Sequence, residues 1–127
     1  MNERSSLRVL VVEDDAVISM LIEDMLDELG HVIDASVARL ATAFELLDSL
    51  HFDVAILDIN VDGEPVFPLA QRLSTLGKPM IFSTGYGQAG LPVEFEKCPV
   101  LAKPYSIADL KRVLEALKVG SISSLRG

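Results

Sequence analysis

The sequence predicts an α/β fold, a doubly wound parallel sheet of five strands flanked by about five helices. Short apolar runs alternate with longer amphipathic segments, which is the pattern of a parallel sheet with helical crossovers. The chain has 127 residues and is 50% hydrophobic, which suits one domain with one well-buried core. Several acidic residues directly follow the predicted strands, where sheets of this kind bind their ligands.

The first strand is expected over residues 7–12, because this run is nearly all apolar and rich in Val, as in a strand covered on both faces. Asp14 or Asp15 can cap a helix over residues 16–29, and Gly30 can end it. The inward stripe of that helix is predicted from its apolar spacing, and it comprises Val17, Met20, Leu21, Met25 and Leu29.

The middle of the chain repeats the pattern of strand and helix. A weaker strand is expected over residues 31–35, and Ser36 can cap a helix over residues 37–50. The third strand is predicted over residues 52–57 and runs directly into Asp58. Residues 60–64, Asn-Val-Asp-Gly-Glu, are expected to form a loop.

Proline and glycine mark the elements of the next segment. Pro65 or Pro68 can open a helix that reaches about residue 76, and a fourth strand is predicted over residues 79–83. Gly85, Gly87, Gly90 and Pro92 lie between Thr84 and Val100, so the fourth helix is expected to be short or irregular.

The last elements are a short fifth strand over residues 99–102 and a final helix. Ser106 and Asp109 resemble a capping box, which starts a helix that is expected to end near Lys118 or Val119. We therefore predict a domain over residues 7–119, with tails at residues 1–6 and 120–127.

Composition excludes several classes of function. The net charge of −8 argues against direct nucleic-acid binding, which needs clustered Lys and Arg. The polar N-terminus and the lack of a long apolar run argue against a secretory signal and a membrane span. Cys98 is the only cysteine, so an intramolecular disulfide is impossible and a reducing cytoplasm is the expected setting.

Acidic and basic groups are predicted to meet at the carboxyl ends of the strands. Glu13 and Asp14 follow the first strand, Asp58 ends the third, Thr84 follows the fourth and Lys103 follows the fifth. Three carboxylates that converge would repel one another unless a cation lay between them. Mg²⁺ suits such a site, and the backbone carbonyl of Asn60 could complete the protein's ligands.

An aspartate at the end of a central strand can act as a nucleophile and form an aspartyl phosphate. We expect Asp58 to accept the phosphoryl group, because it ends the third strand. Lys103 would then pair with a phosphoryl oxygen, and the hydroxyl of Thr84 could donate to another. A bound Mg²⁺ would neutralise part of the incoming charge.

These residues together resemble the receiver domains of two-component response regulators, bacterial signalling proteins. The resemblance rests on Val11-Val12-Glu13-Asp14-Asp15, on Asp58 after an apolar strand, on Thr84-Gly85 and on Lys103-Pro104, and it covers residues 7–118. It implies a flavodoxin-like fold and phosphotransfer from a histidine kinase or a histidine phosphotransfer protein. The domain would be a signalling switch that catalyses only its own phosphorylation and dephosphorylation.

The stretch from Pro79 to Gly87 resembles the Phe-Ala-Thr-Gly motif of the "FAT GUY" receivers, with Ser83 in place of the usual Ala. Many members of that subgroup are single-domain proteins, and some are linked to general stress signalling. The resemblance implies a receiver without an output domain, which passes its signal to a protein partner through the face of residues 85–118. Receivers can dimerise through the same face, so a homodimer is left open.

Two positions depart from the family. The loop that follows the acceptor is usually Met-Pro-x-Met-Asp-Gly, whereas this chain has Val61-Asp62-Gly63-Glu64. Most receivers also carry Tyr or Phe three positions before the lysine, and its rotamer reports phosphorylation. Val100 stands there in this chain, and Tyr86 or Tyr105 are the alternatives for that role.

Other functions are weighed against this interpretation. An aspartyl-phosphate hydrolase usually needs a second acid two residues after its nucleophile, and position 60 is Asn. A receiver-like adaptor that works without phosphorylation would not need the acidic, Thr and Lys set. Residues 85–90 match the dinucleotide-binding pattern G-x-G-x-x-G, but Pro92 follows at once and opposes the helix that such a motif must open.

Overall fold

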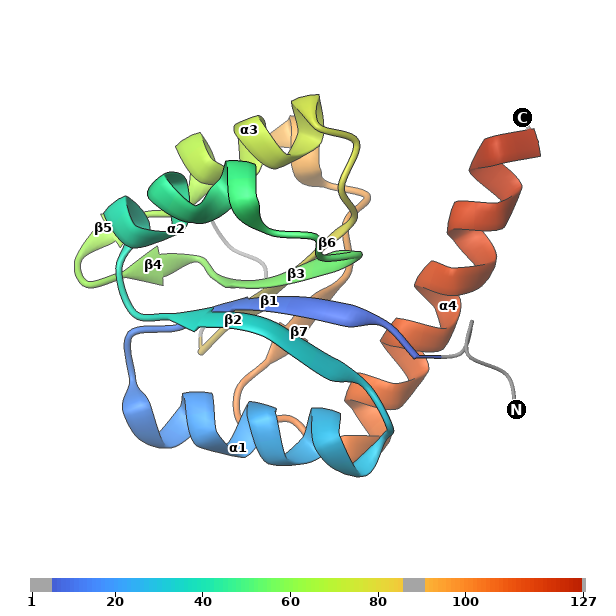
Figure 1. Cartoon of the computed structure of the whole chain (residues 1–127), viewed down its shortest axis with the longest axis horizontal. Helices are drawn as coiled ribbons and strands as arrows, with labels where there is room; N and C mark the ends of the chain where they lie inside the picture. The colour runs from blue at the N-terminus through green and yellow to red at the C-terminus, as the bar shows by residue number, and fades with distance from the viewer. Residues whose placement is uncertain (1–5, 86–90, 127) are drawn as a thin grey trace.

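A parallel sheet of five strands forms the centre of the protein (Figure 1). The structure is a computed structural model that describes residues 6–85 and 91–126. All neighbouring strands of the sheet are parallel, as the sequence predicts. The strands follow the order β2-β1-β3-β6-β7, and they are β1 (Arg8–Val12), β2 (Val32–Val37), β3 (Val54–Asp58), β6 (Met80–Thr84) and β7 (Val100–Ala102).

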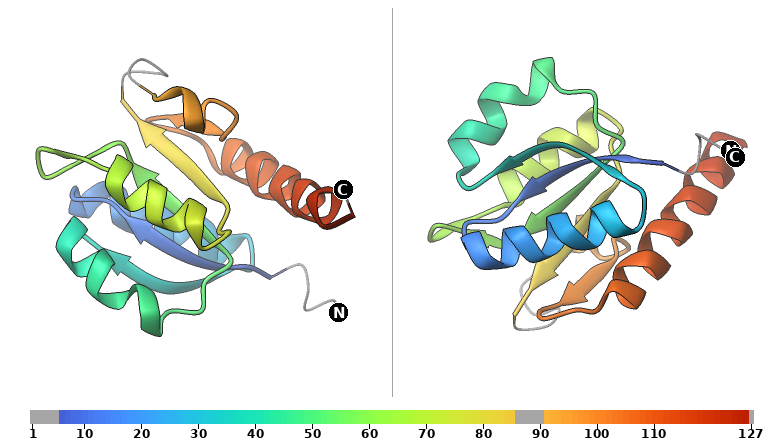
Figure 2. Two further views of the ribbon diagram at one scale, coloured as in Figure 1. Left: turned by 90° about the horizontal axis from the view of Figure 1, so that it is seen from above. Right: turned by 60° about the horizontal axis from the view of Figure 1, so that its bottom comes forward.

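Helices cover both faces of the sheet (Figure 2). On one face lie α1 (Ala16–Glu28) and α4 (Ile107–Arg126), and on the other lie α2 (Leu40–Leu46) and α3 (Phe67–Thr75). Two 3-10 turns complete the described helical structure, η2 (Leu47–Ser49) after α2 and η3 (Val93–Phe95) between β6 and β7. The predicted irregular fourth helix is therefore represented by the short turn η3 in the part of the chain that the structure describes.

Alternate residues of each strand fill two separate cores. Val9 and Val11 of β1 face α1 and α4, together with Ile56 of β3. Leu10 and Val12 face α2 and α3. Because both faces of the inner strands β1, β3 and β6 are buried, their sequences are largely apolar, which is why these strands could be predicted.

The buried stripe of α1 differs from the predicted one. Val17, Met20 and Leu21 are exposed, by 67%, 61% and 54% of their surface, while Ile22 and Leu26 are buried. The segment is apolar on more than one side, so its spacing fits two stripes and does not select between them. Phe44 of α2 is also partly outside the core, with 38% of its surface exposed.

The predicted boundary between the second strand and the second helix is wrong. Strand β2 extends to Val37, which pairs with Val12, and α2 starts at Leu40 after Arg39. Ser36 therefore does not cap a helix. Its hydroxyl donates instead to Glu23 Oε2 of α1 at 2.8 Å, which ties the edge strand to that helix.

The loop after Asp58 contains a small hairpin that the sequence reasoning missed. Strands β4 (Asn60–Val61) and β5 (Glu64–Pro65) pair antiparallel around Asp62 and Gly63. Both turn residues have positive φ, 51° and 82°, as a tight two-residue hairpin turn requires. Pro65 belongs to β5, so Pro68 is the proline in the first turn of α3.

Helix α4 starts at the predicted capping box and is longer than expected. The backbone N–H of Asp109 donates to Ser106 Oγ at 3.1 Å, and the N–H of Ser106 donates to Asp109 Oδ2 at 3.3 Å. The helix then continues to Arg126, beyond the predicted end near Lys118 or Val119. Gly120 does not end it, since one glycine costs a helix only about 1 kcal/mol. Among the described residues, no helix is apolar over a length that could cross a membrane.

Candidate functional site

Five residues that the sequence singles out lie at the carboxyl ends of the strands. Glu13 and Asp14 follow β1, Asp58 ends β3, Thr84 ends β6, and Lys103 follows β7. Glu13, Asp58 and Thr84 are buried, whereas Asp14 is exposed. Strands β1, β3, β6 and β7 are parallel neighbours in the sheet, so their carboxyl ends lie at one edge.

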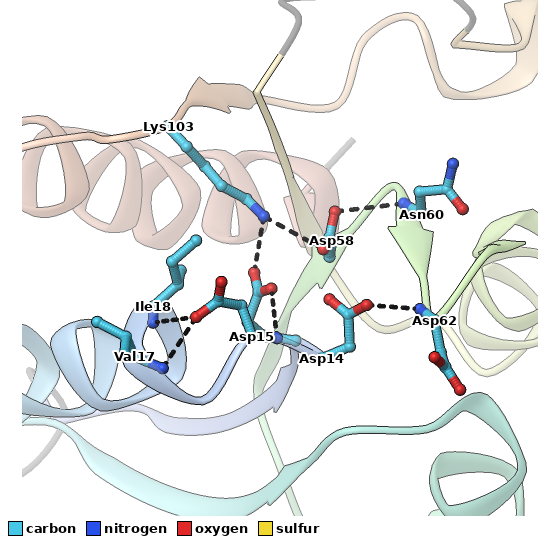
Figure 3. A network of polar contacts seen from close by, with 9 residues as sticks. Asp14, Asp15, Val17, Ile18, Asp58, Asn60, Asp62 and Lys103 are labelled. Carbon is cyan, nitrogen blue, oxygen red and sulfur yellow. Dashed lines mark hydrogen bonds and ion pairs between the residues drawn. The ribbon is translucent and has the colours of Figure 1, made fainter.

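Lys103 lies between the buried carboxylates of Glu13 and Asp58, and Figure 3 shows its contact with Asp58. Its Nζ is 2.9 Å from Glu13 Oε1 and 3.2 Å from Asp58 Oδ2. Burial alone would lower the pKa of Lys103, but the Glu13 and Asp58 carboxylates outweigh it and raise that pKa. Burial also raises the pKa of Glu13, despite the neighbouring ammonium. The lysine therefore stays charged and neutralises only part of the acidic site.

Backbone contacts fix the segment that carries Lys103. The N–H of Lys103 donates to the carbonyl of Thr84 at 2.8 Å, which extends the pairing of β6 and β7 by one residue. The Lys103–Pro104 peptide bond is cis. This segment holds the lysine side chain over the end of the sheet.

Asp14 is held by the hairpin. Its Oδ2 accepts the backbone N–H of Asp62 at 2.7 Å (Figure 3). Burial would raise the pKa of Asp14, but this N–H and other local donors lower it overall, so the group is a carboxylate at neutral pH. The β4–β5 hairpin thus orients one of the three acids.

The N-terminus of α1 lies next to the site and is capped by Asp15. Asp15 caps the helix, and its Oδ1 accepts the N–H groups of Val17 and Ile18 at 2.9 and 3.1 Å. The N–H of Asp15 donates to Glu13 Oε2 at 3.1 Å. Asp15 is therefore the cap, and the neighbouring acids Glu13 and Asp14 are left for the site.

Glu13, Asp14 and Asp58 could hold a metal ion. Each offers one carboxylate oxygen, and these oxygens all lie within 4.8 Å of one another. Hard oxygen donors of this kind suit Mg²⁺. The N–H of Asn60 donates to Asp58 Oδ1 at 3.2 Å, which places Asn60 beside the site. The use of its backbone carbonyl as a ligand stays a prediction.

Two contributors to the site were not found from the sequence. The N–H of Asp62 belongs to the hairpin turn, and the Asp-Gly pair between short β runs was the signal for it. Ser83 pairs with Asp58 across β3 and β6, so it lies beside the expected phosphoacceptor. Only the register of the two strands reveals that neighbour.

Other titratable or reactive side chains lie away from the site, and one predicted motif lies outside the described residues. His31 is buried at the start of β2, and His51 is exposed before β3. Cys98 is half-buried, and burial raises the pKa of its thiol. Tyr86 and most of the G-x-G-x-x-G segment, residues 86–90, lie outside the part that the structure describes.

Fold and site together define a class of protein: a flavodoxin-like α/β domain with an acidic cluster and a lysine at the carboxyl end of its parallel sheet. The chain matches the response regulator receiver domain family over residues 9–115, and it belongs to that family. The receiver domain is a signalling domain and not a metabolic enzyme.

Named relatives agree with this assignment. The two-component response regulator PhoP of Pseudomonas aeruginosa is 30% identical over 116 residues, which cover 87% of this chain and 51% of PhoP. The solution structure of SdrG from Sphingomonas melonis Fr1 superimposes with a TM-score of 0.80 at 31% identity, over 92% of this chain and 98% of SdrG. The BeF3-activated conformation of SdrG gives a TM-score of 0.76 at 33% identity, over 87% of this chain and 94% of that one. The chain spans about half the length of the curated relatives it matches.

Proposed function

We propose that this receiver domain accepts a phosphoryl group on Asp58 from a histidine kinase or a histidine phosphotransfer protein, with Mg²⁺ at the acidic cluster. The observation that carries the proposal is the position of Asp58. Asp58 is the last residue of the central strand, and its carboxylate lies 3.2 Å from the Lys103 ammonium. Carboxylate oxygens of Asp58, Glu13 and Asp14 lie within 4.8 Å of one another, close enough to bind one metal ion.

The proposed reaction transfers a phosphoryl group from nitrogen to oxygen. A carboxylate oxygen of Asp58 forms a bond to phosphorus while the P–N bond of the phosphohistidine breaks. The imidazole ring, protonated on its other nitrogen, keeps the bonding electron pair and leaves as neutral imidazole. Mg²⁺, when bound by Glu13, Asp14 and Asp58, would neutralise charge on the transferring group.

Lys103 and Thr84 have different roles in the proposed reaction. Lys103 would exchange its contact with the Asp58 carboxylate for one with a phosphoryl oxygen, because that group carries about −1.5 to −2 charges. Thr84 would donate its hydroxyl to another phosphoryl oxygen. Thr84 ends β6, where the β6–β7 connection begins, and Lys103 directly follows β7, so their movement would shift a two-state equilibrium of the neighbouring face.

The output of the switch would be a protein partner. We place its binding face on residues 85 and 91–118, which include η3, β7 and the first part of α4, and a homodimer would use the same face. SdrG has a BeF3-activated conformation, and its similarity to this chain supports a comparable activated state here. The cytoplasm is the proposed setting, since a kinase there would supply the phosphoryl group.

Intact mass spectrometry tests the phosphoacceptor. The purified protein is incubated with Mg²⁺ and acetyl phosphate, beside an Asp58→Asn variant and an Asp62→Asn variant. We expect one phosphoryl adduct in the wild type and in Asp62→Asn, dependent on Mg²⁺ and absent from Asp58→Asn. The Asp62 side chain is exposed on the hairpin, so this variant controls for loss of a nearby acid.

The same experiment separates the proposal from its alternative. A wild-type protein that gains no adduct from acetyl phosphate or from a phosphorylated histidine phosphotransfer protein would contradict the proposal. It would support a receiver-like adaptor that binds partners without phosphorylation. An adduct on a residue other than Asp58 would contradict the assignment of the acceptor.

A further inference from the structure

Three large apolar side chains are exposed on the N-terminal half of α1. Val17, Met20 and Leu21 each have more than half of their surface exposed. They are three and four residues apart, so they share the outer side of the helix, away from the buried Ile22 and Leu26. A single exposed apolar residue needs no explanation, whereas a group of them on one side is typical of a surface that another molecule covers.

A hollow of about 190 Å³ adjoins these side chains. It lies between α1 and the segment that follows β7, and its lining is mainly apolar. The lining residues are Ile18, Leu21, Ile22 and Met25 of α1, together with residues 103–105. Leu21 belongs both to the exposed group and to the hollow, so the two form one continuous surface.

The C-terminal half of α1 is acidic on the same outer side. Asp24, Asp27 and Glu28 are exposed, and Asp24 lies three and four residues after Leu21 and Met20. The helix contains no Lys or Arg. In the part of the chain whose side chains are described, none of these three acids forms an ion pair. The outer side of α1, from Val17 to Glu28 with the hollow, is called the α1 face below.

The charges of the α1 face are unfavourable for the helix itself. Asp24 lies three residues before Asp27 and four before Glu28, where like charges repel each other. Asp27 and Glu28 also lie at the C-terminal end of the helix, where the helix dipole favours basic residues and α1 has none. A sequence that breaks such local rules without a gain inside the fold is expected at a functional surface. A partner that supplies positive charge would remove both penalties.

We propose that the α1 face binds a helix of a protein partner that is apolar at one end and rich in Lys or Arg at the other. The apolar end covers Val17, Met20 and Leu21 and places a side chain in the hollow, while the basic end pairs with the exposed acids. The α1 face meets the proposed output face only at residues 103–105. This inference goes beyond the proposed function and does not depend on phosphorylation of Asp58.

Charge selects a basic partner over a second copy of the chain. A symmetric dimer places the same surface of each copy in the interface. Three exposed acids from each copy would then share the interface without a base from either α1, in a chain whose net charge is already −8. Like charges brought together in this way oppose association.

Binding of two synthetic helical peptides to the unphosphorylated protein tests the proposal. One fluorescein-labelled peptide has Leu at every third or fourth position and Lys elsewhere, and the second has Glu in place of Lys. Fluorescence anisotropy should show that only the Lys peptide binds. The combined variant Asp24→Asn, Asp27→Asn and Glu28→Gln should weaken that binding about tenfold, since it removes three exposed charge pairs.

A matched variant separates the α1 face from the overall negative charge. Glu45→Gln, Asp48→Asn and Glu94→Gln together remove the same charge from exposed positions outside α1, and this variant should keep the affinity of the wild type. Far-UV circular dichroism checks that both variants are folded. Equal weakening by the two variants would overturn the proposal, because the peptide would then bind any acidic surface.

The apolar half of the α1 face has its own pair of variants. Met20→Gln with Leu21→Gln should weaken the Lys peptide about tenfold or more, because two buried apolar contacts are lost. Leu76→Gln with Val93→Gln replaces exposed apolar residues elsewhere and should leave the affinity unchanged. Unchanged affinity of the α1 pair would overturn the proposal.

Amide chemical shifts locate the bound peptide on the protein. We expect the Lys peptide to shift the signals of residues 16–28 and 103–105 in a two-dimensional nitrogen–proton spectrum. Shifts confined to other residues would overturn the proposal. So would a wild-type protein that sediments alone as a dimer and becomes a monomer in Met20→Gln with Leu21→Gln, since a second copy would then cover the α1 face.

The outcome is separate from that of the phosphoacceptor experiment. The peptide is bound without phosphorylation, so a protein that gains no adduct on Asp58 and still selects the Lys peptide through α1 supports this inference alone. An adduct on Asp58 together with peptide binding that ignores the α1 variants would overturn this inference and leave the proposed function standing.

Discussion

At the scale of single residues, Lys103 sets the electrostatic balance of the site. One ammonium lies against two buried carboxylates, Glu13 and Asp58, while the third acid, Asp14, is held by a backbone N–H. One positive charge cannot neutralise three carboxylates, so the site retains an attraction for a further cation. The pairing also orients Asp58 before any phosphoryl group arrives.

His31 is a second residue whose charge matters, at the opposite end of the sheet. Its Nδ1 accepts the backbone N–H of Leu7 at 3.0 Å, so this nitrogen must be unprotonated. Burial lowers the pKa of His31, and the positive charge of Lys118 on α4 adds to this against the opposing Glu115. The fold therefore favours the neutral imidazole.

We predict that His31 makes the fold less stable in weak acid. The unfolded chain protonates the histidine near its ordinary pKa of about 6.5, whereas the folded chain protonates it only at lower pH. The unfolded state thus binds more protons between these two values. Stability contributed by the neutral His31 is present above pH about 6.5 and is lost as the pH falls toward the folded-state pKa.

Urea unfolding at pH 7.5 and 5.5 measures this effect, with wild type, His31→Gln and His51→Gln compared. The advantage of the wild type over His31→Gln in free energy of unfolding should shrink at the lower pH. Each unit of pKa difference corresponds to about 1.4 kcal/mol. A constant difference between the two proteins would refute the role of His31, and the exposed His51 supplies the comparison for a histidine change as such.

At the scale of elements, the β4–β5 hairpin connects the acceptor loop to the metal ligands. Val61 in the hairpin and Val66 directly after it are buried, and they anchor the hairpin to the core beside α2 and α3. Its turn presents the N–H of Asp62 to Asp14, while Asn60 donates its N–H to Asp58. A strained turn would therefore disturb two acids at once.

Gly63→Ala should weaken both the hairpin and Mg²⁺ binding. Gly63 has φ +82°, and an added Cβ would meet nothing within 4 Å, so the cost is backbone strain alone, about 1–2 kcal/mol. Gly77→Ala is the matched control, because Gly77 has φ +74° and equally open surroundings at the end of α3. Calorimetric titration with Mg²⁺ should show weaker binding for Gly63→Ala only. Equal affinities of the two variants for Mg²⁺ would show that the hairpin does not support the metal site.

The elements show which parts of the fold the sequence could predict. The five strands were placed within two residues, and β1, β3 and β6 were the clearest because apolar runs covered on both faces are unambiguous. The stripe of α1 was misplaced, since Val17 and Ile22 belong to apolar rows with the same helical spacing, and only packing decides between them. Ser36 is predicted to cap the second helix, but the pairing of Val37 with Val12 extends strand β2 past it.

The residues of the candidate site also differ in whether the sequence could predict them. Glu13, Asp14, Asp58 and Lys103 were predictable because each follows a recognisable strand and the strand ends of such a sheet share one edge. Ser83 and the N–H of Asp62 were not, since their place beside Asp58 and Asp14 depends on strand register and on a turn conformation. Chemistry carried by side chains at strand ends is visible in a sequence, whereas chemistry carried by register is not.

At the scale of the whole molecule, charge should link metal binding to stability. The chain carries a net charge of −8, and three of its carboxylates have oxygens within 4.8 Å of one another. A ligand that binds only the folded state stabilises it by RT ln(1 + [L]/Kd). Mg²⁺ should therefore raise the melting temperature, because the unfolded chain does not hold these acids together.

The expected size follows from this relation. At a Mg²⁺ concentration of ten times Kd, the gain is about 1.4 kcal/mol, or roughly 5 °C for a domain of this length. Thermal unfolding with and without MgCl₂ measures it, with NaCl at equal ionic strength to remove general screening. Asp14→Asn should lose most of the gain, whereas Asp24→Asn, which removes the same charge from an exposed position on α1, should keep it. If Asp24→Asn lost as much as Asp14→Asn, the stabilisation would come from the overall negative charge, and the cluster at the strand ends would not be a metal site.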